Sequence, residues 1–168
     1  MSNVTTVPIE IVDKASGHVS IMHFVTEERQ KGRKLWSREA TDKAIAEELT
    51  RSGQDLNKIA WRRIASDAFP TNRLFRESWR SDGKKLEVDM GLAQAEHMEE
   101  IRRKRDAQLA KKDREWLKEF SRGNIDAADV VEAERQKLRD VPQEIEAEVK
   151  KAKTPEELKA VWPVELKD

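Results

Sequence analysis

The sequence predicts an α+β protein that is mainly helical. Residues 1–90 contain two short runs rich in β-branched residues, separated by turn-forming residues. Residues 91–168 consist largely of Ala, Glu, Lys, Arg and Leu, which are strong helix formers. We therefore expect two regions with these bounds. The first holds a β-hairpin with short helices, and the second holds a helical hairpin with additional short helices.

The β-hairpin is predicted over residues 8–25. Its strands are Pro8–Val12 and His18–Val25, which partly alternate between apolar and polar residues, and residues 13–17 (DKASG) supply the turn. A two-stranded hairpin is only marginally stable alone in water, so it should pack on another element or pair with another strand. Residues 26–35 are polar and basic, which predicts a connector.

Short helices are predicted after this hairpin. Ser37 is expected to cap a helix over residues 38–51, and a second helix is expected over residues 71–79. Residues 59–65 fit either a strand or a helix. Residues 85–89 follow a turn and predict a further strand.

The C-terminal region should hold a long helix that folds back on a second helix. Its apolar stripe is narrow and is interrupted by the basic run 102–105, so we expect it to pair with the next helix or, in the manner of a coiled coil, with another chain. Pro142 is expected to end the second helix, and Thr154 to cap the last. The four helices are predicted at about residues 91–122, 127–139, 144–151 and 155–161.

Composition excludes several classes of protein. The chain has 33 Lys and Arg against 33 Asp and Glu, and no apolar run approaches the roughly 18 residues that a membrane-spanning helix needs. The absence of cysteine excludes disulfides, thiolate catalysis and Cys-based zinc sites. The first residues lack the basic and apolar segments of a secretory signal, which favours a cytoplasmic location.

Catalytic motifs are also missing from the sequence. It contains no phosphate-binding glycine loop, no dinucleotide-binding fingerprint, no nucleophile elbow and no His-Glu-x-x-His zinc motif. His18, His23 and His97 are spread over two predicted elements, so we expect no metal site from them. The sequence therefore predicts a protein that is not an enzyme and needs no cofactor.

Residues 58–85 combine eight basic residues with four aromatic ones, against three acids. Three interpretations remain open: a hydrophobic core with arginines around it, a protein-binding surface, and a surface that binds nucleic acid. The zero net charge makes nucleic acid the less favoured partner, because no long-range field attracts it. The candidate partner-binding residues are Trp61, Arg62, Arg63, Phe75, Arg76, Trp79 and Arg80.

Residues of about 95–145 carry two spaced motifs. The first begins Arg-x-x-Arg-Asp-x-x-Leu and leads to Asp113 and Trp116, and the second reads Arg-Gln-x-Leu-Arg-Asp-x-Pro. This segment resembles the family of bacteriophage tail assembly chaperones and tail fibre assembly proteins, although Trp116 follows Asp113 by three residues rather than directly. The matching positions are Arg102, Arg105, Asp106, Leu109, Arg135, Gln136, Leu138, Arg139, Asp140 and Pro142.

The resemblance implies a small helical protein that helps assemble tails without being an enzyme. Its partner would be a phage tail or tail-fibre protein, met in the host cytoplasm during assembly, and the chain would act alone or as a homo-oligomer. In the helical hairpin, Arg105 with Asp106 and Arg139 with Asp140 would form ion pairs between helices. Two alternatives stay open: a minor tail or fibre-attachment component retained in the virion, and a nucleic-acid-binding regulatory module that uses residues 58–85.

Overall fold

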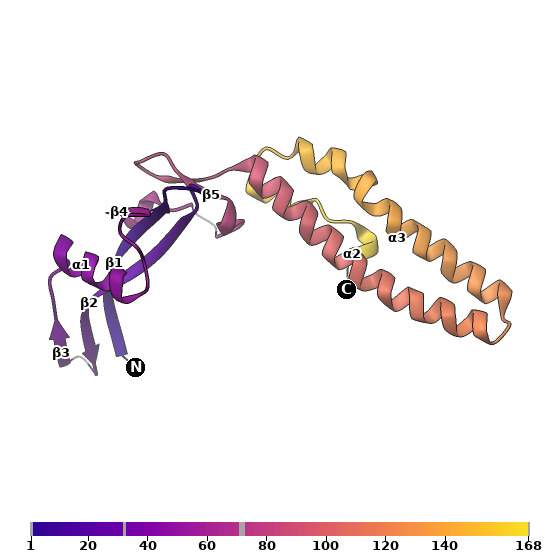
Figure 1. Cartoon of the computed structure of the whole chain (residues 1–168), viewed down its shortest axis with the longest axis horizontal. Helices are drawn as coiled ribbons and strands as arrows, with labels where there is room; N and C mark the ends of the chain where they lie inside the picture. Colours follow the sequence, from indigo (N-terminus) through magenta and orange to yellow (C-terminus); the bar gives the residue numbers. More distant parts are fainter. Residues whose placement is uncertain (1, 32, 71–72, 168) are drawn as a thin grey trace. The chain divides into compact units, whose positions relative to one another are not determined.

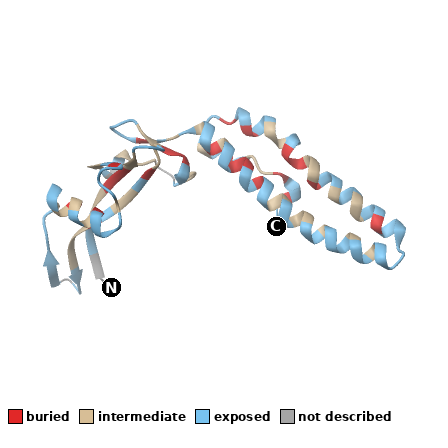
Figure 2. Ribbon diagram, in the orientation of Figure 1, coloured by how far each residue is buried: buried red, intermediate tan, exposed pale blue. Residues whose placement is uncertain are grey.

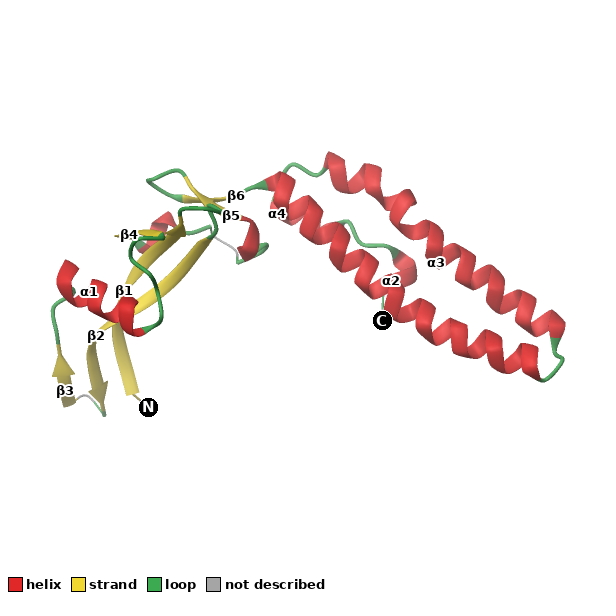
Figure 3. Cartoon of the chain, viewed as in Figure 1, coloured by secondary structure: helices red, strands yellow, loops and turns green. Residues whose placement is uncertain are grey.

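The computed structural model describes residues 2–31, 33–70 and 73–167. The chain forms two compact units, residues 1–89 and 90–168 (Figure 1). Strands make up most of the regular structure in the first unit, and long helices in the second (Figure 3). The α+β class predicted from the sequence is confirmed.

An antiparallel sheet with strand order β3-β2-β1-β4 forms the centre of the first unit. The predicted hairpin is confirmed, and its strands are longer than expected. The expected connector at residues 26–35 is wrong, because β2 continues pairing with β1 after a bulge and then turns into β3. The strands are β1 (Ser2–Asp13), β2 (Val19–Gln30), β3 (Arg33–Ser37) and β4 (Ile59–Arg63).

The helix α1 (Asp42–Arg51) packs its apolar side on one face of this sheet. It begins four residues later than predicted, because the expected cap Ser37 lies in β3 and Thr41 caps the helix instead. The Thr41 Oγ1 accepts the backbone N–H of Ala44 at 3.2 Å. The core on this face consists of Ile9, Ile11, Phe24, Ile45, Leu49 and Ile59.

The second face of the sheet is covered by the segment that follows β4. A small two-stranded sheet, β5 (Trp79–Ser81) and β6 (Leu86–Val88), contributes Trp79 and Leu86 to a core with Val19 and Ile64. The strand predicted at residues 85–89 corresponds to β6.

The helix predicted over residues 71–79 is wrong in its described part, and residues 71 and 72 lie outside the described residues. A single 3₁₀ turn, Arg76–Ser78, replaces it, and Trp79 already belongs to β5. Phe75 has a left-handed backbone with φ +48°, which is incompatible with a continuous right-handed helix.

The second unit is a helical hairpin of α2 (Met90–Ser121) and α3 (Ile125–Lys151). Gly123, with φ +77°, provides the left-handed residue in the turn between them. The predicted break at Pro142 is wrong, because α3 is continuous through this proline. Pro142 and its neighbours Leu138 and Val141 are buried, and this packing offsets the missing backbone hydrogen bond.

The helix α4 (Pro155–Ala160) and the 3₁₀ turn Val164–Leu166 pack along the first part of α2. Thr154 caps α4 as predicted: its Oγ1 accepts the N–H of Glu157 at 3.2 Å, and the Glu157 carboxylate accepts the N–H of Lys153 at 2.8 Å. The buried residues of α2 all lie between Ala93 and Ile101 (Figure 2). The rest of the helix has no α4 beside it to bury its side chains.

Candidate protein-binding surfaces

Arg135 joins the two segments on which the family resemblance rests. Its Nε and Nη2 both approach Oδ1 of Asp113 on α2, at 2.8 and 2.7 Å. Its guanidinium carbon also lies 5.2 Å from the centre of the Trp116 ring, within cation–π range. The sequence pattern thus corresponds to a contact across the hairpin, made by residues 22 positions apart.

The two ion pairs expected between the helices do not join them: Arg105 has its expected partner, but within α2, and Arg139 has a different partner within α3. Arg105 pairs with its own neighbour Asp106, with Nε 2.7 Å from Oδ1. Arg139 donates to Glu132 on the same helix at 2.7 Å. The spacing of seven residues places Arg139 and Glu132 on one face of α3, so this pair forms without reaching α2.

A second ion pair between the helices involves residues that the motif does not include. Lys112 Nζ lies 2.8 Å from Glu134 on α3 and 2.7 Å from Glu115 on its own helix. The hydrogen bonds to Glu115 and then to Glu134 raise the pKa of Lys112. On α3, the hydrogen bond from Arg139 holds the pKa of Glu132 below its usual value.

The other motif residues mainly stabilise the helices. Leu138 and Pro142 are buried, and Leu109 is half-buried. Arg102 is exposed and pairs with Glu99 one turn earlier at 2.7 Å. In α3, Gln136 donates to Asp140 at 2.9 Å.

The closed end of the hairpin, defined as residues 113–135, exposes several large apolar side chains. Trp116 and Phe120 stack with ring centres 4.9 Å apart. Large apolar side chains that gather on a surface mark interaction sites. Four side chains are at least half exposed: Leu117, Phe120, Ile125 and Val130. The sequence pattern places Leu117 and Phe120 on the apolar stripe of the long helix. It does not reveal that α4 packs only along the first part of that helix and leaves these two side chains exposed.

Most candidate residues of the stretch 58–85 are engaged within the first unit. Trp79 is 3 % exposed, and its Nε1 donates to the Leu74 carbonyl at 3.1 Å. Arg62 pairs with Glu10, which is 1 % exposed, and this hydrogen bond raises the pKa of Arg62. Arg63 lies 2.6 Å from Asp42 at the start of α1.

The remaining candidates differ in their exposure. Trp61 packs against the first core, and Arg80 donates to the Trp79 carbonyl at 2.8 Å. Phe75 is half-buried in its left-handed conformation, and the exposed Arg76 lies with its guanidinium carbon 5.8 Å from the Trp79 ring centre. The structure therefore brings Arg76 and Trp79 together at one place.

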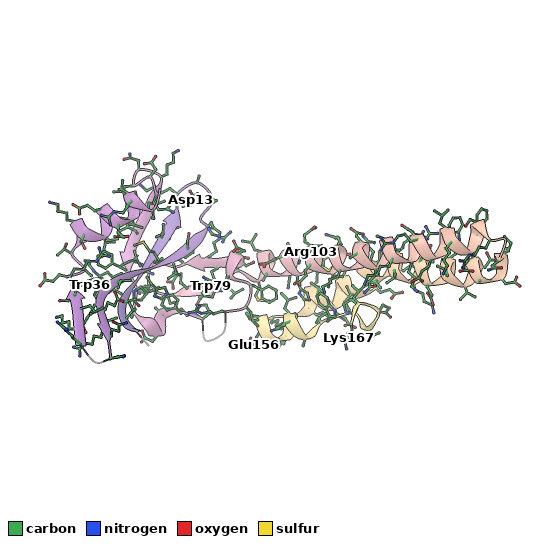
Figure 4. All side chains as sticks on the ribbon, turned by 90° about the horizontal axis from the view of Figure 1, so that it is seen from below. Asp13, Trp36, Trp79, Arg103, Glu156 and Lys167 are labelled. Atoms are coloured by element: carbon green, nitrogen blue, oxygen red, sulfur yellow. The ribbon has the colours of Figure 1, made fainter. Side chains whose placement is uncertain are left out.

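That place is a pocket of about 420 Å3 on the second face of the sheet, which we call the basic pocket. Thr6 and Pro8 of β1 and Ile21 and His23 of β2 form its floor, because alternate residues of a strand point to the same face. Phe69, Pro70, Arg73, Arg76 and Trp79 form its walls. Figure 4 shows Trp79 at the opposite end of the first unit from Trp36 on β3. Of these residues, sequence reasoning identified Arg76 and Trp79 and missed His23 and Arg73.

Comparison with known proteins gives no relative: no protein-family model, curated protein or solved structure matches the chain. Within the described ranges 2–31, 33–70 and 73–167, no three His, Asp or Glu side chains gather in a way that could hold a metal ion. None of the described helices is long and apolar enough to cross a membrane.

Proposed function

We propose that this protein is a non-enzymatic assembly protein that binds a phage tail or tail-fibre subunit through the closed end of its helical hairpin. The observation that carries the proposal is the exposure of Leu117, Phe120, Ile125 and Val130, each at least half exposed, within the closed end of the hairpin. The family resemblance supplies the class of partner, and its two motifs meet at Arg135 in this same part of the hairpin.

The chemistry of the closed end suits a protein partner. Arg and Trp are enriched among the residues that contribute most to protein–protein binding, and Arg135 and Trp116 lie against each other here. Because α2 buries no side chain beyond Ile101 in the isolated chain, a partner would remove apolar surface from water. Each square ångström of apolar surface so buried contributes about 25 cal/mol.

The first test measures this protein by peptide mass spectrometry in purified phage particles and in lysate of the cells that produce them. Abundance in the lysate together with absence from particles supports a transient assembly role. A fixed copy number in particles would replace that role with the structural alternative, a minor tail component. If the producing cells form no particles, the phage assignment is wrong.

A second test locates the binding surface. A tagged chain is used to co-purify tail proteins from infected lysate, and the double variant Leu117→Ser and Phe120→Ser should lose the tail subunit. The matched control is Val164→Ser, which changes another exposed apolar residue of the same unit outside the closed end. Helicity measured by circular dichroism should be unchanged in both. Equal recovery of the tail subunit by all three proteins would contradict the assigned surface.

The nucleic-acid alternative has less support from the contacts in the first unit. Arg62 and Arg63 already pair with carboxylates, and the rings of Trp79 are buried rather than available for stacking on bases. A gel-shift experiment with duplex and single-stranded DNA at about 50 mM salt tests it directly. Binding that falls steeply with salt would favour this alternative over the assembly role.

A further inference from the structure

Beside the basic pocket, one edge of β1 has no partner among the described strands. On this side β4 pairs with β1 only from Ile9 to Asp13, and the N–H of Ile64 donates to the Pro8 carbonyl at 3.1 Å. No described strand continues this pairing along Ser2–Val7. Backbone groups of alternate residues in an antiparallel strand point to the same edge. The backbone N–H and C=O groups of Thr6 and Val4 therefore point to the same edge of β1 as the Pro8 carbonyl. Both residues are exposed.

The pocket next to this edge carries positive charge. Arg73 and Arg76 are exposed, and neither forms an ion pair with any carboxylate that the structure describes. The other three arginines of the stretch 58–85 are bound to Glu10, Asp42 or a backbone carbonyl. These two guanidinium groups and His23 therefore form a discrete site for an anionic group, and guanidinium geometry matches a carboxylate.

Most of the remaining pocket lining is apolar, which restricts the ligand further. Ile21, Phe69 and Pro70 would contact methylene or methyl groups attached to the anion. The left-handed backbone of Phe75, an uncommon conformation for a bulky residue, holds the chain between the two arginines in a fixed turn. A side chain with a short aliphatic stem and a terminal carboxylate fits this combination.

From the open edge and the basic pocket together, we propose that the first unit binds an extended acidic peptide segment of a partner protein. The peptide adds as a strand along Val4 and Thr6 of β1, in line with β4, and places an acidic side chain between Arg73 and Arg76. In this mode the main-chain hydrogen bonds supply affinity, and a pocket for alternate side chains supplies specificity.

A peptide accounts for this site better than a nucleic acid does. Two arginines and one histidine offer few contacts to a phosphate backbone, whose binding grows with each phosphate neutralised. A nucleic acid would also leave the backbone donors of the β1 edge unused. The proposal goes beyond the hairpin-based function because it uses a different surface in the other unit.

The test titrates the full chain with a fluorescent peptide of about seven residues, a common strand length, that alternates glutamate and valine. A second peptide replaces every glutamate with glutamine, and a third probe is a single-stranded DNA oligomer. We expect the acidic peptide to bind roughly tenfold or more tightly than the glutamine peptide, because its carboxylates meet the arginines. Equal binding of the two peptides, or tighter binding of the DNA, overturns the proposal.

Variants locate the binding site. The double variant Arg73→Gln with Arg76→Gln should weaken binding of the acidic peptide by roughly the same factor of ten. The control Arg33→Gln with Lys84→Gln removes the same charge from exposed positions of the same unit and should leave binding unchanged. Unchanged thermal unfolding shows that the variants fold. Equal losses in both double variants would mean unspecific charge attraction and would overturn the pocket assignment.

Amide hydrogen exchange tests the strand addition separately. The bound peptide should slow amide exchange at Val4 and Thr6 and leave exchange along the β3 edge unchanged. Peptide binding without protection of these two amides would contradict the strand addition. The hairpin variant Leu117→Ser with Phe120→Ser should bind the peptide normally. Loss of peptide binding in that variant would place the site outside the first unit, so the two proposals fail in distinguishable ways.

Discussion

Arg135 of α3 and Asp113 of α2 form an ion pair across the helical hairpin, in which two guanidinium nitrogens share one carboxylate oxygen at 2.7 and 2.8 Å. The Arg135 side chain is 17 % exposed, whereas that of Asp113 is 54 % exposed. The pair lies beside Trp116, in the part of the hairpin where α2 buries none of its side chains. Polar contacts between the helices therefore hold their register where buried apolar contacts are sparse.

A double-mutant cycle should show that this pair stabilises the hairpin. We expect a coupling energy of about 0.5–1 kcal/mol between Arg135→Ala and Asp113→Ala, because the ion pair is partly exposed and includes a hydrogen bond. Chemical denaturation of the two single variants and the double variant measures the coupling. Effects that add without any coupling would show that the contact contributes nothing.

Leu138→Asp should destabilise the hairpin strongly, because it places a charge where α3 packs on α2. Leu138 is 7 % exposed, and the change removes an apolar side chain and buries an unpaired carboxylate. We expect a loss of about 3 kcal/mol or more in the free energy of unfolding. The matched control is Val130→Asp on the same helix, which is 62 % exposed and should cost little. Similar thermal midpoints for the two variants would contradict the observed packing.

The buried pair of Glu10 and Arg62 allows a rescue experiment. Glu10 is 1 % exposed, and its Oε1 has no hydrogen-bond partner in the described part of the chain. Arg62→Leu should destabilise the first unit by about 3–5 kcal/mol, because it leaves a buried carboxylate unpaired. Adding Glu10→Leu should restore most of that stability, since the two leucines pack without charge. A double variant no more stable than Arg62→Leu would mean that the site needs the ion pair.

Acid should weaken the first unit through the turn of its β-hairpin. The pKa of Asp13 lies below its usual value of 3.8 because the backbone N–H and hydroxyl of Ser16, and then the N–H of Ala15, donate to its carboxylate. A carboxylate whose pKa is lower in the folded state stabilises the fold above the unfolded pKa. That stabilisation is lost as the pH falls through the folded pKa.

Unfolding curves recorded between about pH 6 and pH 2 measure this contribution. Asp13→Asn should lower stability at the upper end of the range and make stability less dependent on pH below 3.8, compared with the unchanged chain. Parallel pH profiles of the two proteins would show that the turn carboxylate does not stabilise the folded unit.

The sequence predicts the elements that depend on local signals and misses those that depend on tertiary contacts. The turn between α2 and α3 and the cap at Thr154 follow from local chemistry, and both are correct. The helix expected over residues 71–79 fails because Trp79 belongs to the second core, which no local pattern reveals. Pro142 fails as a helix end because burial of its neighbours outweighs one lost hydrogen bond.

The same distinction applies to the candidate surfaces. The resemblance motif includes Arg135, which contacts α2, but it does not include Lys112 and Glu134, which become partners only when the hairpin closes. The basic pocket joins residues of β1 and β2 with Arg73 and Arg76, which lie far apart in the sequence. Spacing alone identifies a basic segment there, and the sheet topology decides which of its arginines line the pocket.

The position of the first helix cap offers a final test of structure against sequence pattern. Ser37 is a favourable capping residue, yet it pairs with Glu27 in the sheet, whereas Thr41 accepts the N–H of Ala44. Thr41→Ala should therefore cost about 1 kcal/mol of stability, a common loss for an N-cap residue. Ser37→Ala should cost little, because its hydroxyl caps no helix in this fold. Chemical denaturation of the two variants compares them directly, and a larger loss for Ser37→Ala would move the helix start back to the position that the sequence predicts.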